Sequence, residues 1–360
     1  MPESMNLVQP GRGNFFEDFH VGQMLHHATP RTITAGDCSL YIALTGSRHV
    51  LHCAQPVAHA LGYREQTVDD LLAFHIAFGK TVPDISVNAV ANLGYADGRF
   101  LHPVYTGDTL STVSTVIGLK QNSNGKSGVV YVHSIAHNQH QQAVCEWKRW
   151  VMVHKQDMNR PAPAPTIPQL PGFVRVGRLA IPGFIDGRQL EISATGGKRL
   201  WDDYLPGERI NHPAGMTVDD SDHTLATKLY QNNARLHFNE KMMRDTPFGR
   251  RLMYGGHVIS VCRALSYDGL ENALGIIAIN AGTHCNPSFG GDTLYTWSEV
   301  MERWELPDRT DLGALRLRMV GLKNITPESL QTTHIESNGR QLYHPNVVLD
   351  FDYTVFIPRR

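Results

Sequence analysis

The sequence predicts an α+β protein built from two copies of one folding unit. Three observations predict this: segments of the second half repeat segments of the first, a proline-rich stretch separates the halves, and each half places helical segments before long β-rich segments. Helices followed by an antiparallel sheet form a layered unit in which the helices cover one face of the sheet. The length of 360 residues suits two such units, each with its own core.

The internal repeat keeps its register over most of the chain. Residues 16–22 read FEDFHVG and resemble residues 201–207, WDDYLPG, which lie 185 positions further on. Residues 103–110 read PVYTGDTL and parallel residues 287–294, PSFGGDTL, which lie 184 positions further on. One residue of drift is what a single small loop change would produce. We therefore interpret the chain as a duplication.

The stretch between the copies is rich in proline. Its prolines are Pro161, Pro163, Pro165, Pro168 and Pro171. Prolines at this density favour an extended, semi-rigid spacer over a helix or a strand. We expect a first domain at 14–155, a linker at 156–175 and a second domain at 176–360.

The expected elements follow the same order in both copies. A short helix is expected at 37–44 and at 222–229, with polar residues near its start, and a second helical segment at 68–78 and at 255–265. Several of the later segments alternate apolar and polar residues, as in a sheet with one wet face. The β-rich segments are 109–119, 127–137, 143–154, 294–304, 314–322 and 346–357. We predict that the copies pack as a pseudo-dimer, with sheets side by side and second helices roughly antiparallel.

Composition excludes several functional classes. The net charge of −1 gives no electrostatic footprint for nucleic acid or an anionic membrane. No apolar run is long enough to span a bilayer, and the N-terminal segment lacks the apolar core of a signal peptide. The five cysteines form no CxxC pair, which favours reduced thiols in the cytoplasm. Neither an HExxH zinc motif nor a GxSxG elbow is present, so we expect neither a metal site nor a serine nucleophile.

Residues 229–239, LYQNNARLHFN, form the first candidate for chemistry. This segment follows an apolar helix and carries amide, guanidinium and imidazole groups through a loop. The imidazole of His237, with an ordinary pKa near neutrality, suits a proton carrier that adds water across a double bond. The alternative is structural: His237 would form local hydrogen bonds and the amides would cap turns.

Gly255 and Gly256 form the second candidate. Paired glycines that open a helix expose backbone N–H groups at the positive end of the helix dipole. Such groups can polarise a thioester carbonyl as it becomes an enolate. The alternative is close packing of the backbone, which by itself also requires glycine.

These two segments resemble the MaoC-like family of R-specific enoyl-CoA hydratases. In that family a D-x-N-P-x-H loop precedes the central helix of a hotdog fold; its Asp and His activate water, and a glycine N–H at the helix start holds the thioester oxygen. Here His237 matches the His, Asn232 stands at the Asp position, and Gly255-Gly256 match the glycine region. The resemblance therefore implies a tandem hotdog fold with His237, Asn232, Gly255 and Gly256 as catalytic residues. In the first copy Ser47 stands at the Asp position.

A closer resemblance extends over nearly the whole chain. Segments such as FHIAFGKTVPDISVNAVANLGYADGRF (74–100) and RRLMYGGHVIS (250–260) resemble the branch of the family that interconverts mesaconyl-C1-CoA and β-methylmalyl-CoA. That branch lacks a histidine at the position of His52, so the resemblance implies that His52 is not catalytic. It also implies a small acyl-CoA as ligand and no metal or organic cofactor, and it leaves homo-oligomerisation open.

The missing Asp is a departure with a physical reason. Mesaconyl-C1-CoA carries a free carboxylate on the carbon that water attacks, so a catalytic Asp would add a repulsion of roughly a few kcal/mol in a low-dielectric pocket. Asn232 keeps the shape without the charge, and an arginine becomes useful to pair the carboxylate. We expect substrate contacts from Arg48, Arg235, Tyr254 and Gln231. The cations expected near the CoA phosphates are Arg250, Arg251, Lys120 and Lys126. Each of these charges has surface solvation or a surface ion pair as its alternative role.

Three other functions stay open at this point. One is a hydratase of another short branched or dicarboxylic enoyl-CoA. A second is a hotdog acyl-CoA thioesterase, for which Asp69 and Asp70, at the start of the first copy's helix, supply carboxylates. The third is a non-catalytic module that binds acyl-CoA.

Overall fold

The two halves of the chain repeat one order of elements in a computed structural model that describes residues 11–337 and 339–360. The helices are α1 (Ala35–Thr45), α2 (Val50–Cys53), α3 (Gln55–Ala60), α4 (Asp70–Ile85), α5 (Ile192–Thr195), α6 (Asp220–Leu229), α7 (Glu240–Arg244) and α8 (Gly255–Leu265). The strands of the first half are β1 (Met24–His26), β2 (Arg31–Thr32), β3 (Ala89–Phe100), β4 (Thr109–Gln121), β5 (Ser127–His137) and β6 (Ala143–His154). Those of the second half are β7 (Arg209–Thr217), β8 (Gly275–His284), β9 (Thr293–Glu305), β10 (Leu312–Lys323), β11 (His334–Ser337), β12 (Arg340–Tyr343) and β13 (Val347–Pro358). Residues 1–10, where the sequence shows no signal-peptide core, lie outside the described part.

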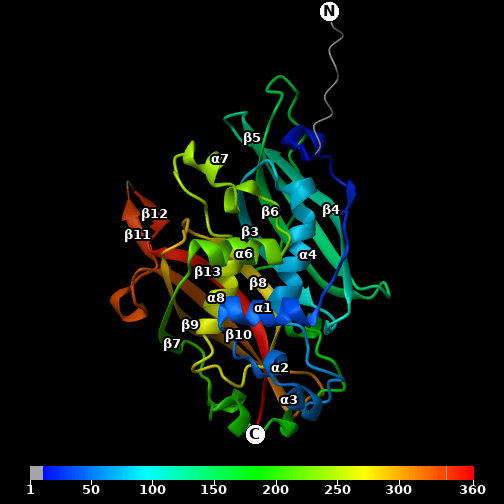
Figure 1. Ribbon diagram of the computed structural model, residues 1–360, viewed down its shortest axis with the longest axis vertical. Coiled ribbons are helices and arrows are strands. Elements are labelled where there is room, and N and C mark those ends of the chain that lie inside the picture. The colour runs from blue at the N-terminus through cyan, green and yellow to red at the C-terminus, as the bar shows by residue number, and fades with distance from the viewer. Residues whose placement is uncertain (1–10, 338) are drawn as a thin grey trace, which may run out of the picture.

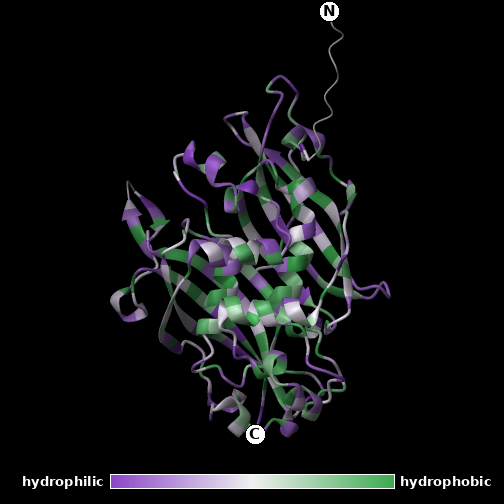
Figure 2. Ribbon diagram, in the orientation of Figure 1, coloured by the Kyte–Doolittle hydropathy of each residue, from purple (hydrophilic) through white to green (hydrophobic). Residues whose placement is uncertain are grey.

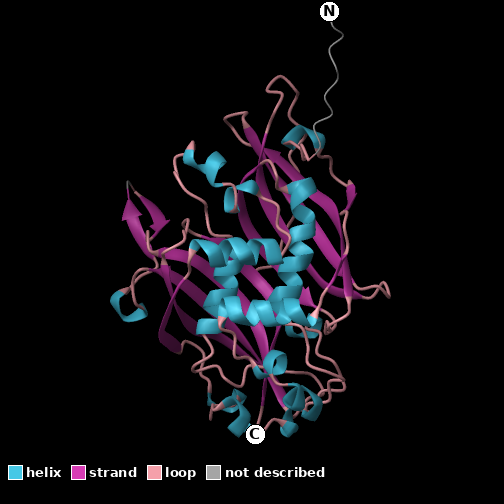
Figure 3. Ribbon diagram, viewed as in Figure 1, coloured by secondary structure: helices cyan, strands magenta, loops and turns pink. Residues whose placement is uncertain are grey.

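One antiparallel sheet of 11 strands runs through both halves, in the order β1-β4-β5-β6-β3-β8-β13-β10-β9-β7, with β2 also paired to β4. The halves join where β3 pairs with β8, with Tyr95 opposite Gly282 and Arg99 opposite Ala278. The main helices of both halves gather on one face of this sheet (Figures 1 and 3). The α+β double hotdog architecture expected from the sequence is confirmed, with the two sheets side by side.

The helices α4 and α8 are buried on nearly all sides. In α4 every residue from Leu71 to Val82 is buried, and in α8 every residue from Gly256 to Leu265 is buried. One apolar core includes side chains from both helices and from the strands beneath them. Figure 2 shows apolar residues concentrated at the centre of the molecule, where the helices lie on the sheet. This shared core fixes the position of each helix start relative to the other half.

The proline-rich segment packs against the first half. The backbone of Thr166 exchanges two hydrogen bonds with that of Leu119 in β4, at 2.9 and 2.8 Å. Gly118 permits this approach, because a Cβ at that position would lie 2.5 Å from the carbonyl oxygen of Thr166. Further along, the N–H of Val174 donates to Asn280 Oδ1 in β8 at 2.9 Å.

The two strands that join the halves are absent from the sequence-based expectations. β3 contains Gly94, Gly98 and Asp97, which has a φ of 49°, and its pairing with β6 shifts register three times. Six consecutive residues of β8 are buried, so this strand shows no alternation. Glycines and bulges hide the first strand, and burial on both faces hides the second.

The helix expected at 68–78 is also longer than predicted. It begins at Asp70, where the side chain of Asp69 accepts a hydrogen bond from the N–H of Leu71, and continues past Gly79 and Pro83 to Ile85. Pro83 lies in the last turn and cannot donate to the carbonyl oxygen of Gly79, and the helix ends two residues later. Within residues 11–337 and 339–360, no helix is long and apolar enough to cross a membrane.

Candidate active site

A cavity of about 300 Å³ lies where the two halves meet. The first half contributes walls from α4, β3 and β6, and the second half contributes the loop around His237, the start of α8 and the end of β8. Gly79 of α4 permits the loop to approach, since a Cβ there would lie 2.1 Å from the carbonyl oxygen of Tyr230. The cavity is largely apolar, and its polar groups come from a small set of side chains.

His237 lines this cavity as a neutral imidazole. It ends the short 3-10 turn Arg235–His237, and its ring Nδ1 lies 3.0 Å from the carbonyl oxygen of Leu252. A carbonyl can only accept, so Nδ1 carries the hydrogen and Nε2 keeps its lone pair. Burial lowers the pKa of His237 to about 4, although the bond to Leu252 opposes this. The imidazole is therefore uncharged at neutral pH and able to take a proton from water.

Asn232 is buried beside His237, with one end of its amide fixed. Its Oδ1 accepts a hydrogen bond from the N–H of Ala234 at 3.0 Å, so its Nδ2 points the other way. The side chain lines the cavity and faces the hydroxyl of Tyr254, whose pKa it lowers slightly against the larger effect of burial. Asn232 therefore offers a donor to the cavity rather than an acceptor.

Tyr254 immediately precedes the start of α8 and lines the same cavity. Burial raises the pKa of its phenol well above the ordinary value, so the hydroxyl keeps its proton. None of the described residues pairs with this buried hydroxyl. Its ring lies 5.4 Å from that of His237, measured between centroids. Tyr254 thus adds a second polar group to the site.

Gly255 and Gly256 form the first turn of α8, whose N–H groups have no partner within the helix. A Cβ at 255 would lie 2.5 Å from the ring of His284, and one at 256 would lie 2.5 Å from the ring of Tyr254. Close packing requires them, and Gly255 lines the cavity at the positive end of a helix.

The sequence analysis did not identify His284 and Arg149, which both line the cavity. His284, at the end of β8, lines the cavity, and its Nε2 lies 3.0 Å from the hydroxyl of Tyr95. Burial lowers the pKa of His284 to about 4. Arg149, in β6, lines the part of the cavity wall that comes from the first half. The sequence did contain a pattern that could have identified Arg149. Buried and less buried residues alternate along β6, and Arg149 occupies a buried position of this alternation, between Trp147 and Val151. No sequence pattern pointed to His284.

The expected substrate contacts are only partly brought together. Tyr254 lines the cavity, and Gln231 lies next to it, where it accepts a hydrogen bond from Lys80. Arg235 is exposed and does not line the cavity. Arg48 lies elsewhere: it pairs with Asp268 at 2.8 Å, and its guanidinium is 4.5 Å from the ring of Tyr267. The structure therefore does not place either arginine where it could meet an acyl group in this cavity.

The four cations expected near CoA are dispersed. Arg250 donates to the carbonyl oxygen of Gly290, and Arg251 pairs with Glu240 at 3.1 Å. Lys120 and Lys126 are exposed near the turn that joins β4 and β5. None of the four lines the cavity.

An open hollow of about 590 Å³ adjoins the cavity and shares Asn232 with it. Its lining includes two lysines that the sequence analysis did not name, Lys80 and Lys228.

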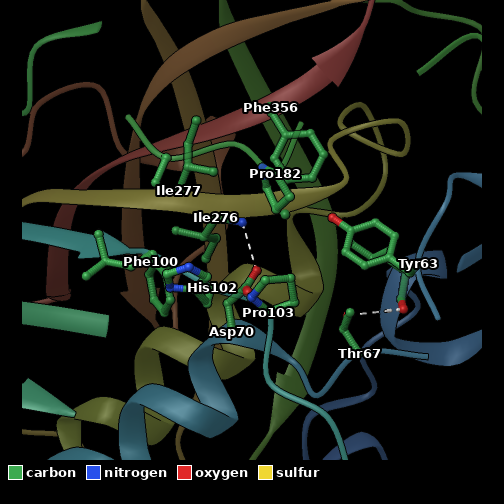
Figure 4. A pocket seen from close by; sticks show the side chains of 14 residues that line it. Tyr63, Thr67, Asp70, Phe100, His102, Pro103, Pro182, Ile276, Ile277 and Phe356 are labelled. Atoms are coloured by element: carbon green, nitrogen blue, oxygen red, sulfur yellow. Dashed lines mark hydrogen bonds between the residues drawn. The ribbon is translucent and has the colours of Figure 1, made fainter. Parts of the chain in front are cut away.

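The corresponding place in the first half holds only a small pocket (Figure 4). Asp70 starts α4 at the position where α8 has Gly255, and its carboxylate accepts from the N–H of Ile276 at 2.9 Å. His52 lies 3.7 Å from this carboxylate and 2.9 Å from the hydroxyl of Thr67. The space that remains is about 40 Å³, enough for water but not for an acyl chain.

The second carboxylate considered for a thioesterase, that of Asp69, is used as the N-cap of α4. Within the described part of the chain, no group of three or more His, Cys, Asp or Glu side chains is placed to hold a metal ion.

Comparisons with known proteins identify relatives of this chain. Residues 18–138 match the family model described as a MaoC like domain. The β-methylmalyl-CoA dehydratase of Chloroflexus aurantiacus is 54% identical over 97% of this chain and 98% of its own. The mesaconyl-CoA hydratase of Cereibacter sphaeroides is 50% identical over 98% of this chain and all of its own length. The solved structure of a MaoC domain dehydratase from Chloroflexus aurantiacus superposes with a TM-score of 0.94, at 53% identity, over 98% of this chain and 99% of that one.

Near-complete coverage at this identity extends the relationship to both halves, beyond the segment that the family model matches. The chain therefore belongs to the family of mesaconyl-CoA hydratases, or β-methylmalyl-CoA dehydratases, among the MaoC-like proteins.

Proposed function

We propose that this protein is a hydro-lyase that interconverts mesaconyl-CoA and β-methylmalyl-CoA, with the thioester at C1 of the mesaconyl group. The relatives at 54% and 50% identity carry the names of this reaction in its two directions. The observation that carries the proposal is the neutral imidazole of His237, whose free Nε2 shares a cavity with the glycine-opened start of α8. A base and an oxyanion site are the two elements that addition of water to an enoyl thioester requires.

The chemistry follows from the positions of these groups. His237 Nε2 takes a proton from water, and the resulting hydroxide adds to C3, the carbon that bears the free carboxylate. Negative charge moves to the thioester oxygen, which the N–H groups at the start of α8 stabilise as an enolate. The imidazolium then returns its proton to C2, so that one water molecule has been added in full. The reverse sequence removes it.

Asn232 takes a different part from the Asp that it replaces. Its Oδ1 is occupied by the N–H of Ala234, so the group that it presents to the cavity is the donor Nδ2. A donor binds the oxygen of the attacking water or of the substrate, and it cannot remove a proton. The proton transfers therefore fall to His237.

The reaction needs neither a metal nor an organic cofactor in this scheme, since acid–base catalysis and an oxyanion site suffice. We place the protein in the cytoplasm, where CoA thioesters and the five free thiols of the chain are compatible with a reducing environment. Homo-oligomerisation stays a prediction.

One assay separates the possible activities. Incubation with mesaconyl-C1-CoA is expected to change the enoyl absorbance without release of free thiol, and the product mass should rise by one water. Release of free CoA would instead identify a thioesterase, and binding without either change would identify a non-catalytic module. The C4 thioester, tested in parallel, is expected to react more slowly than the C1 thioester, and faster reaction of the C4 thioester would contradict the isomer proposed above.

A further inference from the structure

Arg149 is a buried cation without a carboxylate partner. It is 1% exposed, and none of the described residues forms an ion pair with it. Its two hydrogen bonds both come from Nη2, to the hydroxyls of Thr81 at 2.8 Å and Ser86 at 2.9 Å. Its guanidinium stacks on the ring of Phe78 at 4.2 Å. Buried charges are nearly always paired, so this arrangement calls for an anion.

The charge on Arg149 persists at neutral pH and has unused donors. Burial lowers its pKa only to about 10. Its Nε is buried and makes no hydrogen bond with any described residue, and neither does its Nη1. Elsewhere in the same sheet, Arg316 and Arg318 point at Asp352 and Asp350, at 2.6 and 2.7 Å. Arg149 differs from these because it faces the cavity.

A second unpartnered polar group lies beside it. Asn92, on the neighbouring strand β3, also lines the cavity, and both atoms of its amide are buried without a hydrogen bond to any described residue. Asn92 pairs with Val151 in the sheet, two residues along β6 from Arg149. Diagonal neighbours at this spacing lie about 7 Å apart, within reach of one small ligand group. One wall of the cavity therefore holds a cation that has no counter-ion, and an amide that has no hydrogen-bond partner, among the described residues.

We propose that Arg149 and Asn92 bind the free carboxylate of the substrate and make the enzyme specific for dicarboxylic acyl-CoA esters. This inference rests on the proposed function. The carboxylate supplies the missing anion for the guanidinium and accepts from the Nδ2 of Asn92, while Thr81 and Ser86 hold the guanidinium flat on Phe78. Because the carboxylate is bonded to C3, its capture on the first-half wall also positions C3 toward the base on the second half.

The test compares two substrates that differ in the group that would meet this wall. Crotonyl-CoA has a methyl group where mesaconyl-CoA has its carboxylate, and it lacks the C2 methyl. In Arg149→Gln, kcat/KM for mesaconyl-CoA should fall by about 10²- to 10³-fold, the cost of leaving one partner of a buried charge pair alone. The value for crotonyl-CoA should change by less than about fivefold. Equal losses on both substrates would show that Arg149 is only structural and would overturn the inference.

Lys148→Gln is the matched control. Lys148 precedes Arg149 on the same strand, but it pairs with Asp97 at 2.6 Å and does not line the cavity. This variant removes a positive charge from β6 and should leave the ratio of the two kcat/KM values unchanged. A ratio that moved equally in both variants would indicate a general charge effect and would also overturn the inference.

A second measurement does not depend on whether Arg149→Gln folds. Succinyl-CoA and butyryl-CoA are saturated four-carbon esters, which cannot be hydrated, and they differ in the terminal carboxylate. In the wild-type protein, the inhibition or dissociation constant of succinyl-CoA should be at least tenfold lower than that of butyryl-CoA. Asn92→Leu should reduce this preference for succinyl-CoA. Equal dissociation constants would refute the carboxylate site. A wild-type protein that prefers succinyl-CoA but hydrates neither enoyl ester would contradict the proposed function and support this site.

Discussion

Asn232→Asp is the substitution that tests most directly why the family's catalytic Asp is absent. Asn232 is 4% exposed and lines the cavity, so the new carboxylate would be desolvated and would face the substrate's own carboxylate. Two like charges about 5 Å apart at an effective dielectric constant of about 20 repel by about 3 kcal/mol. This corresponds to roughly a hundredfold loss in kcat/KM for mesaconyl-CoA.

The size of the effect should depend on pH. Burial raises the pKa of a carboxyl group, so the introduced Asp stays largely neutral at low pH and ionises as the pH rises. The loss for mesaconyl-CoA should therefore be small near pH 6 and full near pH 8. Crotonyl-CoA carries no competing charge, so its kcat/KM should be retained or improved at both pH values.

The assay is kcat/KM for both substrates in the wild type and in Asn232→Asp, at the two pH values. The ratio between substrates cancels general damage to the fold. Asn233→Asp is the control, since Asn233 is the exposed neighbour and does not line the cavity. A substrate ratio that does not move toward crotonyl-CoA, or that moves equally in Asn233→Asp, would refute the argument from charge repulsion.

Three further outcomes are expected. His237→Gln should lower kcat by about 10²- to 10⁴-fold, whereas His52→Gln should cost far less, and similar losses at both would contradict a single active half. Gly255→Ala should lower kcat and the melting temperature together, because its Cβ meets the ring of His284 at 2.5 Å; unchanged values would show that the ring moves freely. The pKa of His237 and of His284 is about 4 when folded and near 6.5 when unfolded, so their contribution to stability is complete above pH 6.5 and is lost as the pH falls toward 4. Urea unfolding at pH 7, 6 and 5 should show this decline, of up to about 1.4 kcal/mol per pH unit from His237 alone, and a free energy of unfolding that does not fall would contradict it.

The sequence predicted the parts of the fold that have a local pattern. The helix at 255–265 has the bounds that were predicted, because its two glycines and its apolar face mark it clearly. The strands at 127–137 and 143–154 were also located correctly from their alternation. β3 and β8 lacked such a pattern, since glycines and bulges interrupt β3 and six consecutive residues of β8 are buried. The positions of these two strands are determined only when the two halves pair to form the complete sheet.

The site divides in the same way. His237, Asn232 and Gly255 lie close together in the sequence, in one loop and the helix that follows, so a short motif suggested them. Arg149 and His284 come from distant strands, and only the order β6-β3-β8 brings them to the same cavity. The alternation of β6 directs Arg149 inward, but only the pairing of β6 with β3 and of β3 with β8 places that inward face at the cavity.

The two helix starts have a consequence for the evolution and the engineering of the protein. Duplication of a symmetric unit supplies two equivalent helix starts, and the carboxylate of Asp70 occupies the one in α4. Titration of an acyl-CoA should accordingly saturate at one molecule per chain. A copy released from catalysis is free to vary, and here its strands form the wall opposite the base. Variation confined to residues 70–154 therefore offers a route to new acyl preferences, in which libraries of wall residues are screened while the hydration machinery of the other half stays intact.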